Sequence, residues 1–505
     1  MDAFAGLADG IWQAASPPLL LATLIGVVIG LFVGVLPGIG PAAGVAIMLP
    51  VAVGFGGASA IAALAGIYYG AMFGGGVTSI LLGIPGDSPS VMTVIDGHAL
   101  ARRGEAGRAL GMSVSASCLG GCVGLVLLTV LSAPVAQAAL AFGPAEMTAL
   151  MCFALSLVSV LGGRNAAKGF TSLLIGVWLG MIGLDPIGGA TRYTFGLSDL
   201  FDGVDFTVIA VGLFGLSDIF VSLSQQTKGT VARLSLRALL PKLDDLAACR
   251  WIVPTCAGAG FLIGVLPGVG ATAATMVCYA MVKRASRNRH EFGSGAIQGI
   301  AAPESANNAA SYGAMIPLFA LGIPGSATTA VLLGGLLMVG LQPGPLLFTN
   351  NPEFVWTVFG TFWIGNLMLV ALTLLLIPLL AAIVFVPTAV LYPVIIGIVT
   401  FGVYSINYAM SDVAMALVAG AVGFVMLKLD YSPVPLVLGL VLGPLLERGV
   451  RRALIVSNGE LAIFVQQPIA LVFFLLTAAV ILVPLIRGAR AGARAPRADT
   501  PSRPS

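Results

Sequence analysis

The stretch "GVLPGIG" at residues 34–40 places one proline and three glycines inside an apolar run, and a near-copy, "GVLPGVG", stands at 264–270. Proline removes a backbone N–H and clashes with the preceding helical turn, while glycine loosens the backbone. Each stretch therefore predicts a break in a helix. In a lipid bilayer, the backbone groups freed by a break must find partners in the protein or in a water-lined cavity.

The composition points to a membrane protein. Of the 505 residues, 58% are hydrophobic and 9% are charged, and the mean hydropathy is +1.03. A soluble domain carries about 25% charged residues. The 66 glycines and 30 prolines do not indicate a disordered chain, because they sit within apolar runs. We therefore expect an all-α polytopic integral membrane protein, with spans of about 20 residues each.

The chain contains two similar halves. The motif "GIPG" occurs at 83–86 and again at 322–325, and in each half it follows the LPG stretch. The residues around both motifs are also alike, as in "YYGAMFGG" and "SYGAMIPL". We expect an N-terminal repeat at 1–225, a cytoplasmic amphipathic linker at 226–250, a C-terminal repeat at 251–486 and a disordered Arg-rich tail at 487–505.

Charge predicts that the two halves have opposite orientations. Loops rich in Lys and Arg remain on the cytoplasmic side. The segment after the first GIPG, "GHALARRGEAGR" (97–108), is basic, whereas its counterpart, "GLLMVGLQPGP" (335–345), has no charge. The loop before the motif shows the reverse, uncharged at 54–58 and basic at 283–293. These signals predict inverted-topology repeats with broken helices and re-entrant hairpins, and they leave the topology after residue 428 open.

A helix that begins after a GIPG break can bind an anion. Its first N–H groups are unpaired and the helix dipole is positive there. Short polar residues follow both breaks, and the alternative is that they only cap the new helices. The predicted substrate-binding residues are Gly83, Pro85, Gly86, Ser88, Ser90, Asn307, Asn308, Gly322, Pro324, Gly325, Ser326 and Thr328.

A cation can bind to the carbonyl groups that precede a break. The polar island "APESANNAASYG" (302–313) adds carboxylate and amide oxygens within an apolar run, where such groups are expensive. A structural network or an extramembrane loop is the alternative for this island. The predicted residues of a co-transported Na⁺ site are Gly34, Pro37, Gly38, Gly264, Pro267, Gly268 and Glu304.

The sequence carries no pattern of a known enzyme class. It has no HExxH, GxSxG or Walker A motif, and no GxGxxG lies between a strand and a helix. Its two histidines, His98 and His290, lie in basic loops. We therefore expect no catalytic residue, no cofactor and no nucleic-acid partner.

Three long blocks resemble one family, the large permease subunit of tripartite tricarboxylate transporters (TctA-like). They are "GVLPGIGPAAGVAIMLP" (34–50), the block at 66–111 that contains "LLGIPGDSPSVMTVIDGHALARRGEAG", and the block at 302–345 that contains "APESANNAASYGAM". The resemblance covers residues 18 to 450 approximately. One departure is "GDSPS" after the first GIPG, where Glu and small residues are expected.

The resemblance implies a secondary transporter of the bacterial inner membrane. Such a permease is expected to import di- or tricarboxylates with Na⁺ or H⁺, by an elevator-like movement. The implied partners are a small four-helix membrane subunit, a periplasmic solute-binding protein, the carboxylate substrate and membrane lipid. A channel or scaffold subunit, or a different secondary anion transporter, is the alternative.

Overall fold

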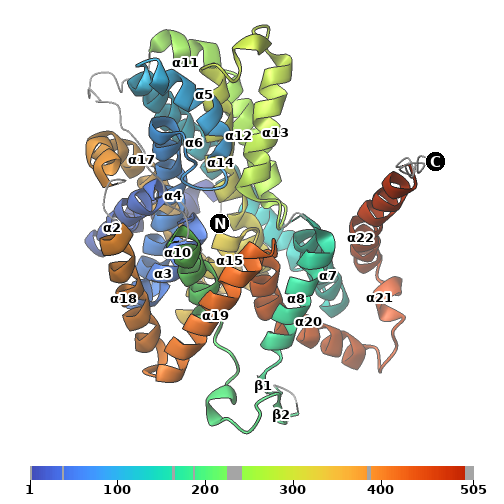
Figure 1. Ribbon diagram of the computed structural model, residues 1–505. Coiled ribbons are helices and arrows are strands. Elements are labelled where there is room, and N and C mark those ends of the chain that lie inside the picture. Colours follow the sequence, from blue (N-terminus) through green and yellow to red (C-terminus); the bar gives the residue numbers. More distant parts are fainter. Residues whose placement is uncertain are drawn as a thin grey trace, which may run out of the picture.

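The computed structural model of the chain describes residues 3–36, 39–161, 165–185, 188–223, 242–383 and 388–494 (Figure 1). It is built from helices, with one two-stranded hairpin among the described residues. The elements of the first half are α1 (Ala3–Ala14), α2 (Pro17–Val35), α3 (Pro41–Val53), α4 (Gly57–Leu82), α5 (Val91–Arg102), α6 (Ala106–Ala139), α7 (Pro144–Leu161), α8 (Ala166–Gly180), β1 (Gly183–Leu184), β2 (Thr191–Arg192), η1 (Ser198–Leu200), α9 (Phe206–Ala210), η2 (Val211–Leu216) and α10 (Ser217–Leu223).

The second half begins after the predicted linker, of which residues 226–241 lie outside the described part of the chain. Its elements are α11 (Leu243–Cys249), α12 (Ile252–Val265), α13 (Gly270–Ala285), η4 (Arg289–Glu291), α14 (Gln298–Gly313), η5 (Pro317–Leu321), α15 (Ala327–Met338), α16 (Pro345–Asn350), α17 (Pro352–Ile383), α18 (Thr388–Asn407), α19 (Met410–Lys428), α20 (Pro433–Val456), α21 (Ile463–Gln466) and α22 (Pro468–Arg494).

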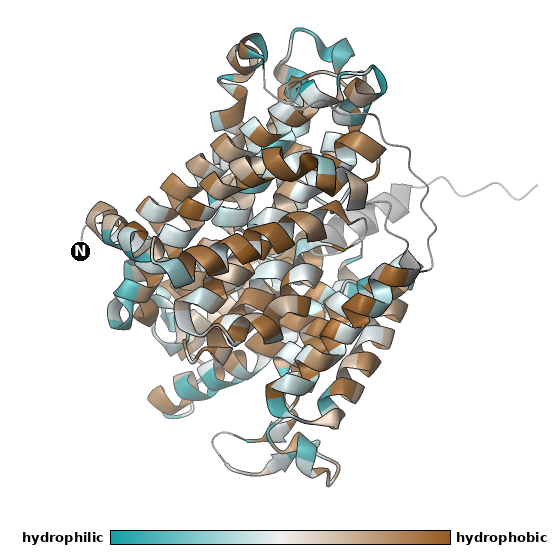
Figure 2. Ribbon diagram, turned by 90° about the vertical axis from the view of Figure 1, so that its left-hand side faces the viewer, coloured by the Kyte–Doolittle hydropathy of each residue, from teal (hydrophilic) through white to brown (hydrophobic). Residues whose placement is uncertain are grey.

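The helices confirm the predicted class of all-α polytopic membrane protein. Among the described residues, eight helical segments are long and apolar enough to cross a bilayer, and a ninth span results if α11 and α12, bent by 50° at a short break, act as one. Hydrophobic residues line the helices, and many of the hydrophilic ones gather in the loops at the two ends of the molecule (Figure 2). The eight segments are α2, α4, α6, α7, 206–223, 352–380, α19 and α20.

All four Gly-Pro motifs lie between helices, as predicted. Helix α2 ends at Val35 and α3 begins at Pro41, and residues 83–90 separate α4 from α5. In the second half, 266–269 separate α12 from α13, and 322–326 separate η5 from α15. The helices after the two GIPG motifs have 12 residues each, about 18 Å, which is too short for a bilayer core of about 30 Å.

Each half contains a row of glycines at which two of its own helices pack together. On α2, Gly26, Gly30 and Gly34 lie directly against backbone atoms of α4, so that a methyl group at any of them would overlap that helix. On α12, Gly260 and Gly264 meet α14 in the same way. Glycines four residues apart allow two helix backbones to approach closely, which is a common way to pack helices in a membrane. The inverted orientation of the halves stays a prediction.

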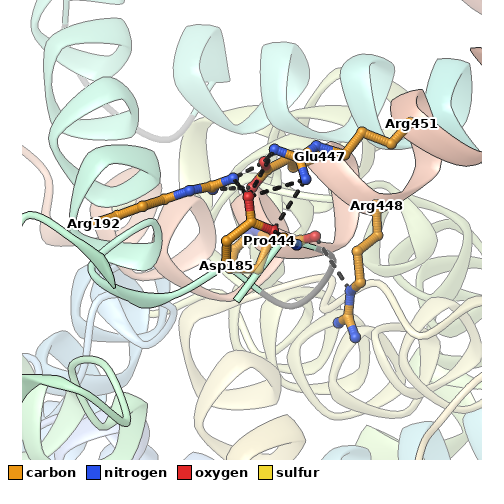
Figure 3. Close-up of polar contacts among 7 residues, drawn as sticks. Asp185, Arg192, Pro444, Glu447, Arg448 and Arg451 are labelled. Carbon is orange, nitrogen blue, oxygen red and sulfur yellow. Dashed lines mark hydrogen bonds and ion pairs between the residues drawn. The ribbon is translucent and has the colours of Figure 1, made fainter. Parts of the chain in front are cut away.

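An ion cluster fixes the β hairpin to α20 (Figure 3). The strands are antiparallel, with Gly183 opposite Arg192. The Arg192 guanidinium contacts Asp185 and lies 2.9 Å from Glu447, and this hydrogen bond to Glu447 raises the pKa of Arg192. Arg451 lies 2.6 Å from Glu447 and 3.1 Å from Asp185. Four charges of alternating sign thus join the hairpin and α20.

The end of the chain differs from the prediction. Helix α22 continues to Arg494, so residues 487–494 are helical, whereas the sequence predicts a disordered tail from 487. Alanine and arginine are good helix formers, and they extend the apolar helix that precedes them. Residues 495–505 lie outside the described part.

Candidate functional site

The two GIPG segments, which we call the first tip (83–90) and the second tip (322–326), begin in the same way. Gly83 ends α4 with φ 71° and ψ 20°, and Gly322 ends η5 with φ 71° and ψ 19°. This left-handed conformation is the usual helix stop for glycine and is costly for other residues. Five consecutive residues before Gly322 form a π-helical turn, a feature often found at functional sites.

Each tip contacts the LPG break of its own half. In the first half, Gly86 faces the carbonyl oxygen of Gly34, and the hydroxyl of Thr78 donates to the carbonyl of Val35 at 2.7 Å. In the second half, the N–H of Gly268 donates to the carbonyl of Gly325 at 3.0 Å. Backbone groups freed by one break are therefore partly satisfied at the neighbouring break, as burial in an apolar protein requires.

Tyr68 brings the two tips to one place. This residue of α4 is 2% exposed. Its hydroxyl interacts electrostatically with the Ser326 side chain on the second tip and with Asp87 on the first tip. Helices α4, α14 and α15 lie near the centre of the molecule (Figure 1). One residue of each tip, Ser326 and Asp87, thus interacts with the same buried hydroxyl.

The first tip is closed by Asp87 and Ser90. The Ser90 N–H donates to Asp87 Oδ1 at 3.0 Å, and the Ser90 hydroxyl donates to the Asp87 carbonyl at 2.9 Å. Ser90 precedes α5, but its side chain makes no capping bond to that helix. Gly86 is buried, Gly83 and Pro85 are half-buried, and Ser88 is exposed.

The second tip is closed by a capping box. The Ser326 hydroxyl accepts the N–H of Thr329 at 3.2 Å, and the Thr329 hydroxyl accepts the N–H of Ser326 at 2.7 Å. Such a reciprocal pair satisfies two of the unpaired donors of a new helix. The capping role that sequence reasoning left open is therefore real at Ser326. Thr328, Pro324 and Gly325 are buried beside it.

The polar island forms part of a buried helix, α14, and is not an extramembrane loop. Glu304 is 1% exposed, and its two carboxylate oxygens accept the hydroxyls of Thr93 at 2.6 Å and Ser117 at 2.8 Å. The Asn308 side chain donates to the carbonyl of Glu304 at 3.0 Å. Both polar atoms of the buried Asn307 side chain have no partner among the described residues. Glu304 therefore joins α14 to α5 and α6, which fits a network and leaves Asn307 free for a ligand.

The predicted Na⁺ residues fall into three groups. Gly34 and Glu304 lie near the first tip, because ideal Cβ atoms on Gly86 and Gly76 would meet them respectively. Gly264 lies at the end of α12, and Pro267 and Gly268 lie in the break that follows it. Pro37 and Gly38 lie outside the described residues.

Sequence reasoning missed the contribution of α6. Ser117 binds Glu304, and an ideal Cβ on Gly76 would lie 2.9 Å from the Ser113 hydroxyl and 3.0 Å from Glu304 Oε1. These two serines are four residues apart and so share one face of α6. Two serines spaced four residues apart in an apolar helix are the sequence pattern that could have predicted this contribution.

Asp96 on α5 also contacts the other half, although it lies outside the tips. It is fully buried, and its Oδ1 accepts the N–H groups of Gly293, Gly295 and Ala296 at 2.8 to 2.9 Å. The Tyr279 hydroxyl donates to Oδ2 at 2.9 Å. All these donors belong to the second half, so Asp96 anchors α5 to it.

Comparison with known proteins agrees with this architecture. Residues 20–438 match the tripartite tricarboxylate transporter TctA family. An uncharacterized 52.8 kDa protein in the TAR-I ttuC' 3' region of Agrobacterium vitis is 39% identical over 493 residues, covering 97% of this chain and 98% of the relative. A second uncharacterized protein, in the TAR-II ttuC' 3' region of the same organism, is 45% identical over 211 residues, covering 42% of this chain and 87% of that protein.

No solved structure matches the chain significantly. The family match covers most of the sequence, including both LPG breaks and both tips, and the first relative aligns along almost its whole length. The protein is therefore a multi-pass membrane protein that belongs to the tripartite tricarboxylate transporter TctA family, the large membrane subunit of such transporters.

Proposed function

We propose that this chain is the permease subunit of a binding-protein-dependent secondary transporter that imports di- or tricarboxylates across the bacterial inner membrane, driven by a Na⁺ or H⁺ gradient. The observation that carries the proposal is the meeting of the two tips at Tyr68. Helix α15 begins directly after Ser326, one of the two tip residues that interact with this hydroxyl, and helix N-termini attract anions without a Lys or Arg side chain.

The substrate carboxylate binds between the tips in this proposal. On the second tip, Ser326 and Thr328 lie at the start of α15, and the capping box uses the N–H groups of Ser326 and Thr329, not those of Ala327 and Thr328. The N–H groups of Ala327 and Thr328, together with the helix dipole, provide the positive field that attracts the carboxylate. The Asn307 side-chain nitrogen, which has no partner among the described residues, donates to a polar group of the substrate.

The transport cycle is elevator-like in this proposal. Helices α5 and α15 are too short to span the bilayer and sit at the tips, as in carriers whose site lies between two repeats. The small four-helix membrane subunit and the periplasmic solute-binding protein complete the transporter, because the family is tripartite by name. The binding protein delivers the carboxylate to the site between the tips.

Reconstituted uptake tests the proposal. Proteoliposomes that contain this chain and the small subunit receive the binding protein outside, and the uptake of radiolabelled citrate and succinate is followed with and without an inward Na⁺ or H⁺ gradient. We expect accumulation that needs both the binding protein and a gradient. Flux that continues without a gradient would instead indicate a channel.

A further inference from the structure

The first tip carries a carboxylate that its own loop satisfies only in part. Asp87 is 6% exposed, and its Oδ1 accepts the Ser90 N–H. Its Oδ2 is buried and has no hydrogen-bond partner among the described residues. A buried charged oxygen without a partner is expensive, and buried polar atoms nearly always have one. The arrangement therefore lacks a positively charged or proton-donating group.

The surroundings of Asp87 add further negative charge. Helix α2 ends beside the first tip, where the Gly34 carbonyl faces Gly86, and the C-terminal end of a helix is the negative end of its dipole. Glu304 lies within electrostatic range of Asp87. Among the described residues, neither Asp87 nor Glu304 forms an ion pair with a Lys or Arg.

Asn307 offers a neutral oxygen ligand on the same helix as Glu304. Asn307 lies three residues after Glu304 on α14, so the two side chains are neighbours on the helix surface. The Asn307 side chain is 1% exposed and both its polar atoms lack a partner among the described residues. Backbone carbonyls at helix breaks, together with side-chain oxygens, are the ligands that membrane carriers use for Na⁺.

We propose that Asp87, with the Asn307 amide oxygen and the Gly34 carbonyl, forms a Na⁺ site at the first tip. The two tips then bind different ions. The first tip binds the cation, and the second tip, which has no Asp or Glu, binds the substrate anion. Bound Na⁺ neutralises Asp87 and removes its repulsion of the anion at Tyr68, so the cation promotes anion binding. This inference rests on the proposed function for its role in transport, but the Na⁺ site itself can be tested alone.

The first experiment measures the melting temperature of the purified chain in detergent, in NaCl and in choline chloride of equal ionic strength. A ligand that binds only the folded state raises the melting temperature as its concentration exceeds its Kd. We expect NaCl to raise it for the wild type and for Asp199→Asn, a control that neutralises an exposed loop carboxylate. The rise should vanish in Asp87→Asn, which keeps the Oδ1 acceptor for Ser90.

Asn307→Ala is the second variant, so that poor folding of Asp87→Asn does not decide the result. We expect the Na⁺ concentration for half-maximal stabilisation to rise at least about tenfold in Asn307→Ala, because even residues that only hydrogen-bond to the ligands of a metal change its affinity by about 10–100-fold. An equal NaCl shift in the wild type and both variants would overturn the site.

Uptake then separates this inference from the proposed function. Citrate or succinate uptake that follows a Na⁺ gradient in the wild type and loses this dependence in Asp87→Asn supports both. Na⁺-driven uptake with the same Na⁺ dependence in Asp87→Asn supports the transporter and overturns the site. An Asp87-dependent NaCl shift without any gradient-driven uptake supports the site and contradicts the transporter.

Discussion

Gly83 and Gly322 adopt almost the same backbone conformation, yet the loops that follow them satisfy their polar groups differently. At the second tip, Ser326 and Thr329 pair with each other and cap α15. At the first tip, Ser90 bonds back to Asp87 and leaves one carboxylate oxygen without a partner among the described residues. Identical motifs therefore fix where a helix stops, while the next four residues decide what the new helix can bind.

The largest expected difference between the tips is in the stability lost when one glycine of each tip is replaced by alanine. In Gly86→Ala, the new methyl group overlaps the Gly34 carbonyl and the Gly75 backbone, which cannot move away cheaply. We expect a loss of about 3 kcal/mol in stability, the upper part of the usual range for overpacking, and loss of uptake. In Gly325→Ala, the nearest atoms belong to Ala314 at 3.2 Å, and we expect about 1 kcal/mol. Thermal unfolding in detergent measures both.

Gly258→Ala is the matched control for these two variants. Gly258 lies on α12 with open space around an ideal Cβ, and alanine is the better helix former, so its replacement should not lower stability or uptake. Equal losses in Gly86→Ala and Gly325→Ala would show that the two tips are packed alike and would break the comparison.

A smaller effect is expected from the capping box. Ser326→Ala removes the acceptor for the Thr329 N–H, and loss of such a cap costs about 1 kcal/mol. Ser88→Ala on the first tip should cost nothing measurable, because Ser88 is exposed. The melting temperatures of the two variants, compared with the wild type, test this; a drop of the same size in Ser88→Ala would contradict the difference between the tips.

The smallest effect concerns two neighbouring hydroxyls of α4. Tyr68→Phe removes a hydroxyl that interacts with Ser326, and we expect a loss of about 0.5 kcal/mol, the lower end of the range for a buried hydrogen bond. Tyr69→Phe removes a buried hydroxyl that has no partner among the described residues, so we expect stability to stay the same or to rise. If Tyr69→Phe proves the more destabilising variant, Tyr68 is not the contact between the tips.

The sequence predicted the breaks well, because they follow from local chemistry. Proline and glycine act within a turn or two, so the helix ends near Gly34, Gly83, Gly264 and Gly322 could be placed without knowing the fold. The amphipathic and apolar patterns likewise predicted a helical membrane protein. The 12-residue helices after each tip agree with hairpins that do not cross the bilayer.

The contacts across the chain could not be predicted in this way. Glu304 accepts hydroxyls from residues 211 and 187 positions away, and no local rule pairs them. The proximity of Tyr68 to Ser326 likewise depends on how the halves pack. Whether Ser326 caps or binds a ligand was also undecided, since the same hydroxyl can do either until its neighbour Thr329 is seen to pair with it.

The bonds of Asp96 have a mechanical consequence. Three backbone N–H groups of the segment at 293–296 hold this carboxylate, so any shift of α5 against that segment must break three hydrogen bonds at once, and the Tyr279 hydroxyl on α13 adds a fourth bond. Helix α5 and that segment should consequently travel as one rigid body. The basic loop at 283–293 adjoins this segment. A displacement of the first tip and α5 would therefore also move this surface loop.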